Sequence, residues 1–151
     1  MGRILGLDVG DVRIGVAVSD PLGITAQALL TIHRAGPEQD FLQIRKLMEE
    51  YETQSVILGH PLNMDGTEGP QALKVRAFAQ ELSDRFGAHV TLWDERLTTS
   101  EARKVLISGG MRREKRKQVI DQAAAVILLQ SYLDAQAHSI DPNSIGSGLD
   151  P

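Results

Sequence analysis

Apolar residues come in three short runs near the start of the chain, separated by polar turns. The runs cover residues 3–9, 13–19 and 26–32. Gly10 and Asp11 separate the first two runs, and a turn-rich segment, 20–23, precedes the third. Short apolar runs with turn residues between them are typical of β-hairpins. The pattern predicts three consecutive strands in an antiparallel meander.

The middle of the chain alternates between strand and helix patterns. Compact apolar runs at 55–59 and 89–93 predict two strands, and helical spacing of apolar residues follows Pro37 and Pro70. The first helix carries its apolar positions at Phe41, Ile44, Leu47, Met48 and Tyr51. The second carries them at Leu73, Ala77, Phe78 and Leu82, and stops at Gly87. Strand–helix–strand units of this kind predict parallel strands.

Two more helices are expected toward the C-terminus. Thr98 and Glu101 have capping-box spacing ahead of a short helix that ends near Gly109. A last helix is expected from about Val119 to Ala137, and turn formers dominate the segment after it. We therefore expect one α/β domain over residues 1–137, a mixed five-stranded sheet flanked by helices, and a mobile tail over 138–151.

Composition excludes several classes of protein. The 151 residues contain no cysteine, which rules out disulfide scaffolds, zinc ribbons and thiol nucleophiles. Aromatic residues make up 4% of the chain, which disfavours a surface of stacked rings for single strands. The net charge of -4 disfavours an overall basic surface but allows a local basic patch. The apolar start of the chain is broken by Asp8, unlike a signal peptide or membrane span, so we expect a cytoplasmic protein.

Asp8 is the first candidate for chemistry, because it interrupts a strand that should be buried. A buried carboxylate is stabilised by a bound divalent cation, or the residue caps the turn at Gly10.

The second candidate is the pair Asp94 and Glu95 at the end of the last strand. Neighbouring strand residues point to opposite faces, so only one of the two easily approaches Asp8, and a solvated ion pair with Arg96 is the alternative.

Asp121 is the third candidate, expected in the first turn of the last helix and followed by small alanines. A helix N-terminus favours a carboxylate by itself, so this residue alone decides nothing. Together, however, the three acids come from three separate elements and would suit Mg²⁺ or Mn²⁺. Two such ions can promote hydrolysis of a phosphodiester, which predicts a nuclease.

A basic run stands just before Asp121. It consists of Arg112, Arg113, Lys115, Arg116 and Lys117. These charges would lead a phosphate backbone toward the acids without reading its sequence, or they form a solvated loop. The polar segment 63–68 at another strand end could also approach substrate, or it is only a flexible connection.

Four blocks of the chain resemble the YqgF (RuvX) family of Holliday-junction resolvase-like proteins, which are assigned to pre-16S rRNA maturation. The blocks are LGLDVGDVRIGVAVSD (5–20), GHPLNMDGTEG (59–69), WDERLTTSEAR (93–103) and DQAAAVILLQSYLD (121–134). The resemblance implies an RNase H-like fold and a nuclease of pre-16S rRNA, with Asp8, Glu95 and Asp121 as catalytic and metal-binding residues. His60 departs from the family, which usually has an apolar residue there, and we expect it to be a surface or cleft side chain without a chemical role.

Other functions remain open from the sequence. A resolvase would use the same acids on branched DNA and would require a two-fold dimer, whereas the nuclease could be a monomer or homodimer. A non-catalytic RNA-binding or transcription-associated factor would keep the acids without cleavage. An actin-like or sugar-kinase-like ATPase is disfavoured because 151 residues leave no room for a second lobe.

Overall fold

The first three strands of the chain form the antiparallel meander. The computed structural model describes residues 2–97 and 113–139. The strands are β1 (Ile4–Val9), β2 (Arg13–Ser19) and β3 (Ala26–His33). β2 lies between the other two and is antiparallel to both. The meander predicted from the three apolar runs is therefore confirmed.

The second half of the sheet is parallel. Two strands, β4 (Ser55–His60) and β5 (His89–Asp94), extend the sheet beyond β1. The resulting order is β3-β2-β1-β4-β5, which confirms the mixed five-stranded sheet. The carboxyl ends of β1, β4 and β5 meet at one edge because these three strands run in the same direction.

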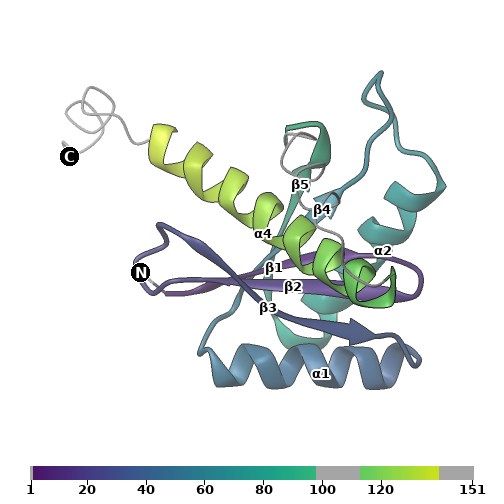
Figure 1. The fold of residues 1–151 in the computed structure, drawn as a ribbon, viewed down its shortest axis with the longest axis horizontal. Coiled ribbons are helices and arrows are strands. Elements are labelled where there is room, and N and C mark those ends of the chain that lie inside the picture. Colours follow the sequence, from purple (N-terminus) through teal and green to yellow (C-terminus); the bar gives the residue numbers. More distant parts are fainter. Residues whose placement is uncertain (1, 98–112, 140–151) are drawn as a thin grey trace.

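Helices cover both faces of the sheet. The helices α1 (Pro37–Glu50) and α2 (Pro70–Phe86) share the larger core with β1 and β4. The long helix α4 (Arg113–Ser139) crosses the other face (Figure 1) and forms a smaller core there. That smaller core contains Ala17, Ile57, Ala125, Leu129 and Leu133. The sheet thus has an α1/α2 face and an α4 face, and the two faces carry different residues of each strand.

Both early helices begin as their sequences indicate, and α2 also ends as predicted. A proline occupies the first turn of each helix, where its missing N–H costs no hydrogen bond. Gly87 ends α2 in the left-handed conformation, with φ of 64°. The predicted apolar face of α2 is partly wrong, because Leu73 and Ala77 are exposed and Ala72 and Val75 are buried in their place. Leu73 is 52% exposed, one position away from the face that meets the sheet.

The predicted start of the last helix is also wrong. α4 begins at Arg113, so most of the basic run is helical rather than a loop. Arg, Lys and Glu are good helix formers, so this run extends the helix instead of interrupting it. α4 also ends at Ser139, so His138 and Ser139, which were expected in the tail, are helical. The short helix expected after Thr98, Arg112 and residues 140–151 of the expected tail lie outside the described residues. Within the described part, no helix is long and apolar enough to cross a membrane.

Candidate active site

Asp8 lies near the end of β1 and belongs to the α4 face. Its neighbours Leu7 and Val9 are buried in the core beneath α1 and α2, so the alternation of the strand turns Asp8 the other way. In the antiparallel register with β2, Asp8 pairs with Gly15. Leu7 pairs with Leu58, and the next step of this parallel register sets Asp8 beside Gly59 of β4. A half-buried carboxylate is therefore flanked on both sides by residues without side chains.

Gly15 brings α4 down onto the sheet at this point. A Cβ added to Gly15 would lie 1.9 Å from the backbone oxygen of Asp121. Any larger residue would push the helix away, so the glycine permits the close approach. Because Gly15 is the cross-strand partner of Asp8, the approach sets Asp121 beside Asp8.

Gly59 makes room for Glu95 on the other side of Asp8. Glu95 begins a short 3-10 helix, Glu95–Leu97, directly after β5. Its carboxylate folds back over the sheet, and a Cβ added to Gly59 would lie 2.7 Å from Glu95 Oε2. The two glycines thus form a cradle around Asp8, with Asp121 over one side and Glu95 over the other.

Asp94 faces away from this cradle. It pairs with His60 in the sheet register, whereas Gly59 pairs with Trp93 on the α4 face. Its carboxylate accepts hydrogen bonds from the guanidinium of Arg96, the shortest of 2.7 Å from Nη2. These bonds hold the pKa of Asp94 below its ordinary value. Of the two neighbouring acids, Glu95 lies on the Asp8 side and Asp94 is engaged by Arg96.

Asp121 is an interior residue of α4, not a residue of its first turn. Because the helix begins at Arg113, the dipole of the helix N-terminus does not explain this carboxylate. Its Oδ2 accepts a hydrogen bond of 2.6 Å from Nε of Arg13 at the start of β2. The guanidinium therefore supplies the positive charge at Asp121 in this structure. Arg13 was not among the residues predicted for the site, although its position two residues before Gly15 puts it on the same face of β2.

The donor set of this cradle suits a hard divalent cation. The three carboxylates come from three elements that meet around Asp8, and the Arg13 side chain neutralises one of them, Asp121, as a cation would. As the side chains are placed, no group of three His, Cys, Asp or Glu residues within the described ranges is close enough to hold a metal ion. The strand register and the two glycines bring the three elements together, and in this placement the carboxylate of Asp121 is bonded to Arg13.

The polar segment 61–69 is tied to the same end of the sheet. Arg96 donates from Nη1 to the carbonyl oxygen of Met64 at 3.2 Å. His60 is 8% exposed, so of the two expected placements, surface or cleft, the surface is wrong. Its Nε2 lies 2.8 Å from Oε2 of Glu68, which also accepts from Arg76. The hydrogen bond from Arg76 is the largest cause that keeps the pKa of Glu68 below its ordinary value, and the hydrogen bond with His60 acts in the same direction.

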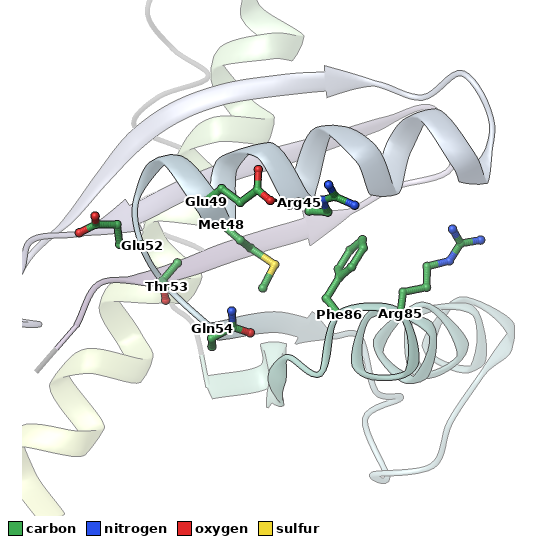
Figure 2. Close-up of a pocket in the computed structure, with 8 residues that line it drawn as sticks. All are labelled: Arg45, Met48, Glu49, Glu52, Thr53, Gln54, Arg85 and Phe86. Carbon is green, nitrogen blue, oxygen red and sulfur yellow. Dashed lines mark hydrogen bonds and ion pairs between the residues drawn. The ribbon is translucent and has the colours of Figure 1, made fainter.

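A pocket of about 420 Å³ lies far from these acids in the fold. Its lining includes Thr53 and Gln54, which precede β4, and residues from the ends of α1 and α2 (Figure 2). Asp8 and Glu95 instead lie at the carboxyl ends of β1 and β5, the opposite ends of the parallel strands. The two arginines that line the pocket are paired with acids, Arg45 with Glu49 and Arg85 with Glu38 and Glu81. The volume of this pocket therefore does not indicate the site of chemistry.

Comparisons with known proteins agree over most of the chain. Residues 2–135 match the RuvX family model, described as Holliday junction resolvase. A relative from Thermoanaerobacter pseudethanolicus, named "Putative pre-16S rRNA nuclease", is 53% identical over 89% of this chain and 97% of its own length. A protein of the same name from Heliobacterium modesticaldum is 50% identical over 90% of this chain and 91% of its own.

Solved structures show the same fold at low sequence identity. Thermus thermophilus RuvC in complex with a Holliday junction substrate has a TM-score of 0.54 and 12% identity, over 91% of this chain and 96% of that one. The fowlpox virus resolvase bound to Holliday junction DNA has a TM-score of 0.55 and 14% identity, over 89% and 98%. The fold is that of the RNase H-like resolvases. On the family match and the identity to its relatives, the chain belongs to the RuvX family.

Proposed function

We propose that this protein is a divalent-metal-dependent nuclease that hydrolyses phosphodiester bonds in the 5′ maturation of pre-16S rRNA. The observation that carries the proposal is the cradle of Gly15 and Gly59 around Asp8, which admits Asp121 and Glu95 on either side. Three acids from distant parts of the chain converge because two strand positions lack side chains. Membership of the RuvX family and the names of its relatives support the same activity.

Asp8, Glu95 and Asp121 would hold one or two Mg²⁺ or Mn²⁺ ions. When bound, such ions activate a water molecule and stabilise the leaving oxygen of the phosphodiester. The chain itself supplies the negative charge, Asp8 from the central strand of the sheet and Asp121 from a helix that packs closely on Gly15. Arg96 fixes the turn after β5 by bonding Asp94, and so holds Glu95 between two anchored neighbours.

The substrate would reach this site along α4. The described residues of the basic run lie in the first turns of the helix that carries Asp121, so they would precede the acids along a bound backbone. Contacts of this kind position a strand without specifying its sequence. RNA structure rather than base identity would then select the cleavage site.

Branched DNA is the second candidate substrate. The family description and the structural similarity to two resolvases favour it. Cleavage of paired strands at a junction requires a two-fold dimer, so the oligomeric state separates the two candidates. A monomer that cleaves a 5′-extended 16S precursor and leaves a four-way junction intact would support the RNA nuclease. A dimer with the opposite preference would support the resolvase.

Cleavage of the 5′-extended precursor by wild type and Asp8→Asn tests the proposal. The amide keeps the size of the side chain and removes the charge that would bind the metal, so we expect cleavage to be lost and the fold retained. Asp11→Asn is the matched control, since Asp11 lies in the adjacent turn and is 63% exposed in a pair with Lys74. Full activity of Asp8→Asn, in protein free of host nucleases, would refute the mechanism.

A further inference from the structure

Arg13 is placed at the candidate site by the same register that places Asp121. It is the first residue of β2 and lies two positions before Gly15, so both belong to the α4 face. Its Nε donates to Oδ2 of Asp121 at 2.6 Å. The two side chains are 28% and 23% exposed, so each is open to solvent on one side.

This ion pair is unlike a buried structural pair. A partly exposed pair contributes little net stability, because water solvates the separated charges well. The bond uses only Nε, and the two terminal nitrogens of Arg13 have no hydrogen-bond partner among the residues that the structure describes. A guanidinium stays charged at all relevant pH values and offers a planar fork of donors. Asp121 could therefore exchange Arg13 for a cation at small cost, leaving the fork of Arg13 available.

We propose that Arg13 is a phosphate-binding residue of this site: it neutralises Asp121 in the absence of nucleic acid and binds a backbone phosphate when substrate is present. The inference rests on the proposed function, since it assumes that the acids face a nucleic-acid backbone. Phosphate suits a guanidinium because two oxygens can accept two parallel hydrogen bonds from it. Nothing about the exchange requires the strand or the helix to move.

Removal of Arg13 should change metal binding in opposite directions for a purely structural role and for a phosphate-binding role. If Arg13 only supports Asp121, then removing it should disorder the carboxylate and weaken binding of a cation. If Arg13 competes with the cation for Asp121, then removing its positive charge should strengthen binding, because like charges repel at short range. The sign of the change in Mn²⁺ affinity therefore separates the two roles without any measurement of cleavage.

The experiment compares wild type with Arg13→Gln, Arg13→Lys and the control Arg85→Gln. Arg85 is 30% exposed and paired with Glu38 and Glu81, so it is close to Arg13 in exposure and is likewise engaged by acids, but away from the candidate site. Binding of a 5′-extended 16S precursor fragment is measured without divalent metal at several salt concentrations. Binding of Mn²⁺ is measured separately without RNA, and circular dichroism checks that each variant is folded.

Arg13→Gln should bind the RNA fragment more weakly, and its log–log salt slope should fall by about 0.7 to 0.9, the value of one phosphate contact. Arg13→Lys should keep most of the slope because it keeps the charge. Arg13→Gln should bind Mn²⁺ about tenfold more tightly, which corresponds to about 1.4 kcal/mol of relieved repulsion. Arg85→Gln should match wild type in both assays.

An unchanged salt slope in Arg13→Gln, or weaker Mn²⁺ binding, would overturn the proposal and assign Arg13 to support of Asp121. Asp121→Asn provides a second route, because the neutral amide pairs less strongly with Arg13 and RNA binding without metal should therefore tighten. If Asp121→Asn leaves RNA binding unchanged, Arg13 does not bind phosphate. If wild type binds no Mn²⁺ at all, the proposed function fails, and the salt slope still decides the role of Arg13.

Discussion

Alanine at the two cradle glycines should have different effects on stability and on activity. Gly15→Ala adds a methyl group that would overlap the backbone of Asp121, with the carbonyl oxygen at 1.9 Å and the carbonyl carbon at 2.4 Å. Gly59→Ala adds one that would meet the side chain of Glu95, with Oε2 at 2.7 Å and Cγ and Cδ both at 3.1 Å. The first clash can be relieved only by moving a helix, and the second by rotating one flexible side chain.

The size of each effect follows from what must move. Overpacking of a well-packed site costs about 1–3 kcal/mol, which corresponds to a fall in Tm of about 2–12 °C for a domain of this size. We expect the loss of stability of Gly15→Ala to fall in this range, because α4 must move away from β2 to make room for the methyl group. Gly59→Ala should change Tm by no more than about 3 °C, since the end of Glu95 can swing aside. That swing removes a carboxylate from Asp8, so cleavage and Mn²⁺ binding should fall with the fold intact.

Thermal unfolding, Mn²⁺ binding and cleavage of the precursor are measured on both variants. Gly2→Ala is the control, because a Cβ at Gly2 would meet nothing within 4 Å. A Gly59→Ala protein with wild-type cleavage and metal affinity would show that the placement of Glu95 over Gly59 is irrelevant to function. A Gly15→Ala protein with the same Tm as wild type would show that α4 does not pack on β2 as closely as described.

Three further predictions concern the charged residues. Glu95→Gln should abolish cleavage, and Asp94→Asn should reduce it much less, because Asp94 faces away from Asp8; equal losses in one assay would refute this assignment. Because Arg96 lowers the folded-state pKa of Asp94 below its ordinary value, the Asp94 carboxylate adds stability above that ordinary value, and this stability is lost as the pH falls through the folded-state pKa. Urea unfolding of wild type and Asp94→Asn should therefore converge in acid, and a constant difference would contradict the pairing. Replacing the basic run by Gln should flatten the salt dependence of RNA binding by roughly 0.7–0.9 per lost contact, with single-turnover cleavage at saturating RNA unchanged; cleavage that collapses at an unchanged slope would make the run a support for Asp121.

The elements of the fold could be predicted from local pattern. Runs rich in Val and Ile, prolines at helix starts and Gly87 at a helix end each act over a few neighbouring residues. The errors came where local pattern is ambiguous. The apolar residues Leu73 and Ala77 lie on the exposed side of α2, and the charges after Arg113 continue a helix although they resemble a loop.

The candidate site could be predicted only in its residue types. Acids in a strand, at a strand end and in a helix suggested a metal site, and alternation alone left Asp94 and Glu95 undecided. The decision depends on Gly59 and Gly15, whose importance appears only once the register sets them on either side of Asp8. Arg13 was missed for the same reason, since its partner lies 108 positions away in the chain.

A crystal structure of the protein soaked in Mn²⁺ tests the central claim most directly. Anomalous scattering locates the ion independently of the protein coordinates. The account predicts Mn²⁺ in contact with Asp8, Glu95 and Asp121, between the two cradle glycines, with Asp121 turned away from Arg13. Mn²⁺ bound elsewhere, or a cradle without the ion at saturating concentration and Asp121 still bonded to Arg13, would contradict it.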